Sequence, residues 1–216
     1  MRRALPLLLF VALLVAACGE EVRVIRYAGG GPWSEIRFRD GLPHGTWRTW
    51  WENGSPKSEG AYRAGRQHGR WRTWFEDGSP LAEERYVRGR PESLWTHWYA
   101  NGQKASEGRY VAGRKDGVWQ EWYGDGKARA RAEYDEGVQL GLALVWWPNG
   151  NKKNEIEYKG GIADGRQTLW WENGQKMAAG RLHGADKLGR WTAWNPDGTL
   201  NTEYSGVYEK GAKVTD

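Results

Sequence analysis

The residues best suited to catalysis or metal binding are histidines and glutamates that recur with one constant period along the chain. His44 and His68 share one position of that period. A second position holds Glu59, Glu83, Glu107 and Glu155. Histidine is a common metal ligand and proton carrier, and paired carboxylates can serve as general acid and general base. Either chemistry would require the fold to bring the members of one set close together.

Neither set predicts an active site or a metal site. Later in the chain the position of His44 holds Glu92, Asp116, Leu140, Asp164 and Leu188. Such variation is typical of a turn position and not of a ligand set. His97 and His183 lie elsewhere in the period, and the sequence identifies no partner for them. Carboxylates on successive hairpins lie about 10 Å apart, which suits pairing with Lys or Arg on a neighbouring strand rather than sharing a proton.

Other signatures of chemistry are also missing from the sequence. It contains no Ser–His–Asp arrangement, no glycine-rich phosphate loop and no cysteine spacing that suits zinc. Without Arg2 and Arg3, which lie in a predicted leader, the formal net charge falls from +5 to +3. An excess this small does not predict nucleic-acid binding. We therefore expect a protein that is not an enzyme and that has no cofactor, no metal and no nucleic-acid partner.

The single cysteine, Cys18, has a different chemistry, and it cannot form a disulfide within its own chain. It follows a positively charged start, Met1-Arg2-Arg3, and an apolar segment at residues 4–17. That segment has the length of a signal peptide and is short for a membrane span. The residues Val15-Ala16-Ala17 before the cysteine resemble the recognition sequence of bacterial lipoprotein signal peptidase. Residues 1–17 are therefore predicted to be a lipoprotein signal peptide, with Cys18 as the lipidated mature N-terminus.

Lipidation of Cys18 would tether the protein to a membrane of the bacterial cell envelope. The thiol would then carry lipid and would not act as a nucleophile or a metal ligand. Gly19 follows the cysteine, and in enteric bacteria a residue other than aspartate at this position favours the outer membrane. We expect the outer membrane or a periplasm-facing location. An ordinary secretory signal with an unrelated cysteine, or an uncleaved signal anchor, is the alternative.

The elements that position these side chains are repeats of 24 residues, which is the spacing from Trp50 to Trp74. One position is Trp in all seven repeats: Trp50, Trp74, Trp98, Trp122, Trp146, Trp170 and Trp194. An Asn-Gly or Asp-Gly pair follows it every time, from Asn53-Gly54 to Asp197-Gly198. No insertion or deletion is needed to keep this register. The sequence therefore predicts an array of similar structural units and not a globular domain with specialised segments.

Each repeat has the pattern of a β-hairpin. In residues 46–65 a run of Trp and Thr precedes Asn53-Gly54, and a second run ends at Tyr62. Asn-Gly favours a tight primed turn because both residues tolerate positive φ, and Trp, Thr and Tyr favour strands. A second glycine-containing turn leads to the next repeat. The predicted fold is all-β: an elongated antiparallel β-meander of 24-residue hairpins in one twisted sheet.

The period also predicts the domain boundaries. Residues 18–32 are expected to be an N-terminal tether, and residues 33–216 to form the repeat array. The array is expected to begin with a capping half-repeat at 33–44, followed by seven full repeats from about residue 45. The last unit is degenerate, because Asn195 replaces an aromatic residue.

The motif Gly-x-Trp-x-x-Trp-aromatic-x-Asn/Asp-Gly, followed by Glu-x-x-Tyr-x-x-Gly, resembles MORN repeats. It is most similar to the bacterial variant of the repeat found in YwqK-family antitoxins, over about residues 33–206. The resemblance implies an elongated, twisted antiparallel sheet and a binding or scaffolding role, including an antitoxin-like or immunity-like one. Two repeats depart from the motif, because the position of Trp47 holds Ala143 and Gln167. A uniform groove along the whole array is therefore not expected.

Strand alternation separates two sets of aromatic residues. Trp47, Thr49 and Trp51 should face one way, and Trp50 the other way unless a bulge intervenes. The invariant position, Trp50 to Trp194, is predicted to form the structural core by packing against the position of Tyr62. The following position varies among aromatic residues and is the candidate for partner contact: Trp51, Phe75, Tyr99, Tyr123, Trp147 and Trp171. The alternative is that both sets are structural.

Together these features predict a lipid-anchored repeat protein that acts as a protein–protein binding scaffold in the bacterial cell envelope. Arg, Lys, Asp and Glu alternate between the aromatic positions, which suits a surface that binds protein. The alternative is binding of a glycan, such as peptidoglycan or a polysaccharide, in a trough of aromatic rings. The sequence carries no polar signature specific for sugars.

Overall fold

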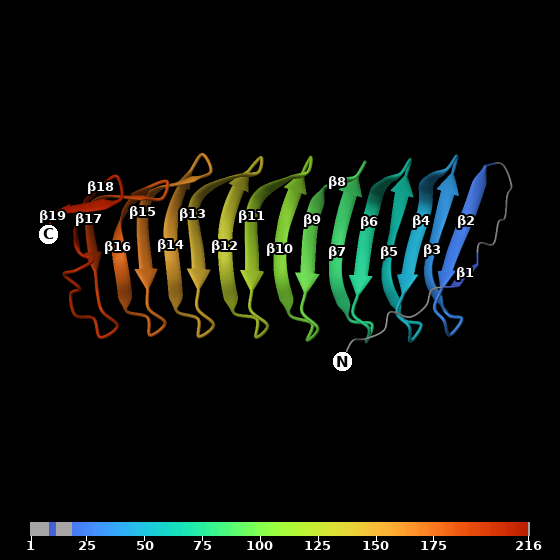
Figure 1. Cartoon of the computed structure of the whole chain (residues 1–216), viewed down its shortest axis with the longest axis horizontal. Helices are drawn as coiled ribbons and strands as arrows, with labels where there is room; N and C mark the ends of the chain where they lie inside the picture. The colour runs from blue at the N-terminus through green and yellow to red at the C-terminus, as the bar shows by residue number, and fades with distance from the viewer. Residues whose placement is uncertain (1–8, 12–18, 216) are drawn as a thin grey trace. The chain divides into compact units, whose positions relative to one another are not determined.

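The computed structural model describes residues 9–11 and 19–215, and of residues 9–11 it describes only the backbone. Within these residues the regular structure consists entirely of β-strands (Figure 1). Cys18, the predicted lipidation site, lies outside the described residues. The chain divides into two compact units, Met1–Gln103 and Lys104–Asp216.

The first unit is an antiparallel meander in which each strand pairs with the next one along the chain. Its strands are β1 (Leu9–Val11), β2 (Glu20–Arg26), β3 (Pro32–Arg39), β4 (Leu42–Trp50), β5 (Pro56–Arg63), β6 (Arg66–Trp74), β7 (Pro80–Val87), β8 (Arg90–Pro91) and β9 (Ser93–Trp98). The short strands β8 and β9 both pair with β7. They form two strands instead of one at the position where Ser93, with a φ of 63°, replaces the glycine of the other repeats.

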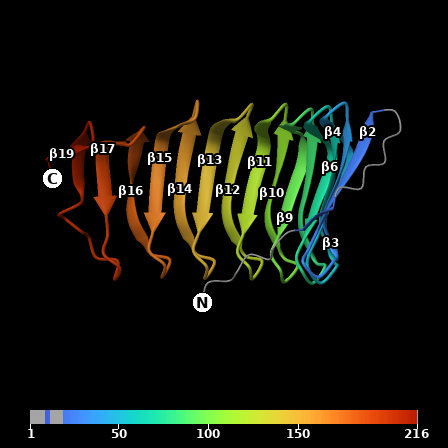
Figure 2. The ribbon, with the colours of Figure 1, turned by 45° about the vertical axis from the view of Figure 1, so that its right-hand side comes forward.

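The second unit repeats the same arrangement. Its strands are β10 (Lys104–Val111), β11 (Arg114–Trp122), β12 (Ala128–Asp135), β13 (Val138–Trp146), β14 (Lys152–Lys159), β15 (Ile162–Trp170), β16 (Lys176–His183), β17 (Asp186–Ala193), β18 (Gly206–Glu209) and β19 (Ala212–Thr215). Strands β10 to β17 lie side by side in chain order in both views (Figures 1 and 2). The prediction of an all-β antiparallel meander of repeated hairpins is confirmed.

The Asn-Gly turns differ from the predicted two-residue primed turn. The backbone N–H of Trp51 donates to the carbonyl of Ser55 at 2.9 Å, and that of Gly54 donates to the carbonyl of Trp51 at 2.9 Å. Only Gly54 of the pair has a positive φ, at 87°. The side chain of Asn53 instead accepts the backbone N–H of Ser55 at 2.8 Å. Asn and Asp are favoured here because they cap the backbone of a longer turn.

The primed turns occur at the opposite ends of the strands. Ala64 and Gly65 have φ values of 49° and 75° and connect the paired residues Arg63 and Arg66. Two consecutive residues with positive φ match the right-handed twist of an antiparallel pair. Ala64 is strained in this conformation, because a left-handed φ brings Cβ close to the following carbonyl oxygen.

The predicted tether at residues 18–32 is corrected by the structure. It contains β2, which pairs with β3, followed by a turn of the same kind as those in the repeats. The backbone N–H of Tyr27 donates to the carbonyl of Gly31 at 2.8 Å, and that of Gly30 donates to the carbonyl of Tyr27 at 2.9 Å. Tyr27 and Gly30 lie one period before Trp51 and Gly54, so they belong to a further repeat that precedes the expected half-repeat.

Candidate functional site

One side of the first unit carries a row of aromatic rings across strands β4 to β9. Trp47, Tyr62, Trp71, Tyr86 and Trp95 follow one another with ring centroids 6.4, 5.2, 6.1 and 5.1 Å apart. The first three pairs are edge-to-face, at 75–90°, an arrangement that aromatic pairs favour, and Tyr86 and Trp95 are tilted at 60°. We call the side of each unit that carries these repeat positions the aromatic face.

The aromatic face also holds the most buried tryptophans of the described residues. Trp71 is 6% exposed and Trp191 is 1% exposed, whereas Trp47, Trp95 and Trp119 are half-buried. Burial raises the pKa of the Tyr62 phenol on the same face. Because the sheet has one layer here, rings that pack against each other along this face take the place of a two-layer core.

Glycines beneath the tryptophans allow this close packing. A Cβ atom placed on Gly60 would lie 2.2 Å from a ring atom of Trp71, and one on Gly108 would lie 2.1 Å from a ring atom of Trp119. The same relation joins Gly180 to Trp191 at 2.3 Å. The indole rings therefore lie directly on the backbone of the preceding strand, where only glycine leaves room.

Two repeats without this tryptophan also lack the glycine. In one repeat Ala143 stands at the tryptophan position and Ala132 at the glycine position. In the next repeat Gln167 and Ile156 stand at these positions and pair with each other, and Ala143 lies opposite Ile156 on its other side. A small residue replaces the ring in the fifth repeat, and a larger aliphatic residue replaces the glycine next to Gln167. The departures noted in the sequence are therefore compensated by neighbouring side chains.

The invariant tryptophans that lie within strands, from Trp50 to Trp170, face the other side of the sheet from Trp47 and Trp71, whereas Trp194 follows the end of β17. In the first full hairpin a register shift falls between Thr49 and Trp50. The Arg72 guanidinium lies 5.8 Å from the ring centroid of Trp74, and all seven tryptophans are half-buried. The prediction that this position packs against the position of Tyr62 is wrong, because Tyr62 contacts Trp47 and Trp71. The deepest burial belongs to the position of Trp71 instead of to the predicted core.

The predicted partner-binding position joins successive repeats. The indole N–H of Trp51 donates to the carbonyl of Trp74 at 3.2 Å, and the hydroxyl of Tyr123 donates to that of Trp146 at 2.6 Å. Trp147 and Trp171 make the same bond to the carbonyls of Trp170 and Trp194, at 3.1 and 3.0 Å. The hydroxyl of Tyr27 donates in the same way to the carbonyl of Trp50 at 2.8 Å.

Six aromatic side chains were predicted at this position: Trp51, Phe75, Tyr99, Tyr123, Trp147 and Trp171. All six are half-buried. Phe75 has no polar group that could make the bond. The hydrogen bonds of Trp51, Tyr123, Trp147 and Trp171 explain why Trp and Tyr predominate at this position, because both carry a donor at the end of a large ring. Partner contact is therefore no longer the simplest explanation of this position.

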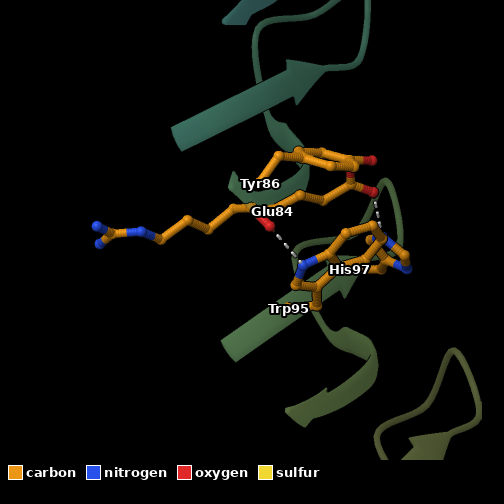
Figure 3. Close-up of polar contacts among 5 residues, drawn as sticks. Glu84, Tyr86, Trp95 and His97 are labelled. Carbon is orange, nitrogen blue, oxygen red and sulfur yellow. Dashed lines mark hydrogen bonds and ion pairs between the residues drawn. The ribbon is translucent and has the colours of Figure 1, made fainter. Parts of the chain in front are cut away.

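A polar cluster interrupts the aromatic face at the third repeat (Figure 3). Glu84 lies opposite Trp71, at the position where Gly60 lies one repeat earlier. One of its carboxylate oxygens accepts the hydroxyl of Tyr86 at 2.9 Å, and the other lies 3.1 Å from Nε2 of His97. His97, for which the sequence indicates no partner, therefore has one in Glu84. The two residues are distant along the chain, and only the strand register brings them together.

Trp95 completes the cluster from β9. Its ring centroid lies 5.1 Å from that of Tyr86 and 6.3 Å from that of His97. Its indole N–H donates to the carbonyl of Arg85 at 3.2 Å (Figure 3). The cluster thus combines a carboxylate, an imidazole and two rings on one half-buried patch, a mixture of apolar area and orientated polar groups.

In the second unit, lysines take part in the aromatic face. The Lys115 ammonium lies 4.3 Å from the ring centroid of Trp119 and 5.0 Å from that of Tyr134. The Lys187 ammonium lies 4.9 Å from Trp191 and 4.7 Å from Tyr208. Burial, with a smaller contribution from nearby Glu121, raises the pKa of Tyr134. The aromatic face therefore carries an acidic group in the first unit and cations in the second.

The glutamates that suggested acid–base chemistry form ion pairs. Glu59 lies 3.5 Å from Arg48, and Glu83 lies 2.5 Å from Arg70, both across strands. Glu107 and Glu155 pair with Lys104 and Lys152 at 2.6 Å within their own strands. Among the described residues no group of three or more His, Cys, Asp or Glu side chains is placed to hold a metal ion.

The fold and this face together define a class: a protein built from in-register β-hairpin repeats. Residues 43–64, 67–88, 91–112 and 139–159 match the family model of the MORN repeat variant. The chain is therefore a MORN-repeat protein, as the resemblance predicted. A comparison with curated proteins found no match. In the part of the chain that the structure describes, no helix has the length and apolar character needed to span a membrane.

Proposed function

We propose that this MORN-repeat protein is a non-enzymatic binding scaffold, held at a membrane of the bacterial cell envelope by lipid on Cys18. Its aromatic face receives a protein partner. The observation that carries the proposal is the row from Trp47 to Trp95, in which rings lie side by side across several strands and all but the buried Trp71 are half-buried. Trp and Tyr are the residues that most often dominate protein interfaces.

The charges on the aromatic face support a protein as partner. Glu84 presents a carboxylate in the first unit, and Lys115 and Lys187 present ammonium groups in the second. In each unit taken by itself, aromatic anchors with a charged group beside them match an interface in which aromatic residues form the core and charged residues the polar rim. An antitoxin-like or immunity-like role is a narrower form of this proposal, in which the partner is a toxin.

The geometry of the rings favours protein over glycan. Tyr62 and Trp71 lie at 90° to each other, and Trp71 and Tyr86 lie at 75°. The edge of each ring then covers part of its neighbour's face. A sugar ring would need an open, flat aromatic face for stacking, whereas apolar side chains of a protein can fill the spaces between tilted rings.

The absence of catalysis is part of the proposal. Its support is that the polar cluster of Glu84, Tyr86 and His97 is already hydrogen-bonded internally. Both carboxylate oxygens of Glu84 have partners, Tyr86 and His97. A general base needs an oxygen directed at the substrate.

Site-specific photo-crosslinking in the native host tests the partner. A photoreactive phenylalanine analogue would replace Tyr86 on the aromatic face, and Arg85 on the other side would be the matched control. We expect one protein to crosslink from position 86 and not from position 85. Equal crosslinking from both positions, or crosslinking from position 85 alone, would place the partner elsewhere. Capture of polysaccharide in place of protein would support the glycan alternative.

The lipid anchor has its own test, because Cys18 lies outside the described residues. Cells would be fed an alkyne-bearing fatty acid, and the wild type would be compared with Cys18→Ala. We expect label only in the wild type, and release of the variant from membranes or accumulation of its precursor. An unlabelled, soluble wild-type protein would refute the anchor and would leave the binding proposal standing.

A further inference from the structure

A pocket of about 260 Å³ lies in the second unit, on the part of the aromatic face where the repeat pattern ends. Its walls include Gln167, Ala178 and Trp191 from β15, β16 and β17, and Tyr204 from the segment that follows β17. Gln167 occupies the position that holds Trp in five of the seven repeats. The smaller side chain leaves space that a ring fills in those repeats.

Most of the pocket surface is apolar. Leu169, Met177, Ala178 and Ala193 contribute aliphatic groups, and Trp171, Trp191 and Trp194 contribute rings. An apolar cavity of about 150 Å³ is large enough to bind benzene, and sites for drug-sized ligands begin at about 300 Å³. The volume of this pocket therefore suits a single aromatic ring with a short chain, or a short alkyl chain.

Two amide side chains in the walls are engaged within the protein. Gln167 donates from Nε2 to Asn154 at 3.0 Å, and Asn201 donates from Nδ2 to Asn195 at 2.8 Å. The charged side chain in the walls is Lys187, whose ammonium lies over the rings of Trp191 and Tyr208. Within the described residues no carboxylate forms an ion pair with it, so its positive charge is available to a ligand.

We infer that this pocket binds a small apolar carboxylate, with its ring or chain among the aliphatic and aromatic walls and its carboxylate on the Lys187 ammonium. Charge complementarity sets the anionic group, and the volume sets the size of the apolar part. The pocket lies within the second unit, and its binding of a small molecule can be measured on the protein alone, without the proposed protein partner.

The test is a titration of the full-length protein with 3-(4-fluorophenyl)propionate, followed by fluorine NMR. The neutral amide of the same compound is the matched ligand. We expect saturable binding of the acid with a Kd on the order of 1 mM, as the size of the ligand allows, and binding of the amide about tenfold weaker. Equal binding of acid and amide, or no saturable binding of the acid, would overturn the inference.

Two pairs of variants locate the binding. Lys187→Met should weaken acid binding about tenfold and leave amide binding unchanged, whereas Lys115→Met, at the same repeat position, should change neither. Ala178→Phe should fill the pocket and abolish binding, whereas Ala130→Phe, also at its own equivalent position, should not. Circular dichroism would confirm that each variant is folded. If both lysine variants bind the acid equally, the site is wrongly placed.

A peptide separates the two sources of an apolar carboxylate. The tripeptide Gly-Gly-Phe with a free C-terminus offers the same ring and carboxylate at the end of a polypeptide. We expect it to bind more weakly than the free acid, because its peptide groups find no polar partners in the apolar walls. Tighter binding of the tripeptide would show that the pocket recognises a chain terminus, which contradicts the assignment to a small molecule.

Discussion

Replacing Gly108 by alanine should destabilise the protein because Trp119 lies on the glycine. The added Cβ would lie 2.1 Å from a ring atom of Trp119, much closer than any real contact. The indole is also held by its N–H bond to the carbonyl of Arg109 at 3.1 Å, so the ring must move or the strand must shift. Overpacking of this kind costs about 1–3 kcal/mol of the free energy of unfolding.

The sign of this effect should reverse when the ring is removed. Trp119→Ala alone should cost about 3 kcal/mol, the lower end of the usual range for a tryptophan, because the side chain is only half-buried. In that background Gly108→Ala should stabilise the protein by about 0.5–1 kcal/mol, because alanine loses less conformational entropy than glycine in a strand. The φ of Gly108 is not positive, so its backbone accepts alanine.

Urea unfolding of the four proteins, followed by far-UV circular dichroism, measures the coupling. The expected interaction energy between the two sites is about 1.5–4 kcal/mol. Ala132→Gly is the matched control, because Ala132 occupies the same repeat position and precedes Ala143, where the ring is missing. It should cost about 0.5–1 kcal/mol. Additive effects of Gly108→Ala and Trp119→Ala would refute the packing of tryptophan on glycine.

Three further predictions concern the turns and the contacts between repeats. Tyr123→Phe removes the hydrogen bond to the carbonyl of Trp146 and should lower the free energy of unfolding by about 1 kcal/mol, measured by urea unfolding; no change would show that the bond is not a structural contact. Ala64→Gly relieves the strain of a φ of 49° and should raise the free energy of unfolding by up to about 1 kcal/mol, seen as a higher melting temperature. A lower melting temperature would argue against strain at this turn. The pKa of Asp77 is lowered mainly by the hydroxyl of Ser79, so the unfolded chain binds a proton at higher pH than the folded chain. The resulting stability is present above the ordinary aspartate pKa of about 3.9 and is lost as the pH falls through the lowered pKa. The pKa of Asp197 is lowered mainly by the hydroxyl of Thr199 and that of Asp125 mainly by Lys127. Asn substitution at Asp77, Asp125 and Asp197 should therefore flatten the loss of stability in acid, and an unchanged acid profile would contradict this.

The constant period of the sequence was enough to predict the hairpins and their order. The Asn-Gly pairs and the strand-forming runs repeat without a gap, and hydrogen bonding between neighbouring strands follows from that regularity. Tyr27 and Gly30 carried the same signal for the additional N-terminal repeat. It was missed because β2 has no tryptophan at the invariant position, where Arg26 lies.

The functions of the individual aromatic positions could not be predicted from alternation. Tyr62 pairs with Gly45 and therefore shares the side of Trp47, whereas Trp50 faces the other side, so the expected contact with Tyr62 does not form. The bond from Trp51 to the carbonyl of Trp74 depends on the direction of an indole after the turn, which residue types do not specify. The pairing of Glu84 with His97 requires the register of β7 and β9, which is set by the whole hairpin.

The central claim is that the aromatic face binds the protein partner and that the position of Tyr123 joins repeats. The affinity of the crosslinked partner for two variants tests it most directly. Trp95→Ala should weaken binding by about 2 kcal/mol, or roughly 30-fold, with the protein still folded. Tyr123→Ala should lower the melting temperature and leave the affinity of the folded protein within about twofold of wild type. Unchanged affinity for Trp95→Ala, with a large loss for folded Tyr123→Ala, would contradict the claim.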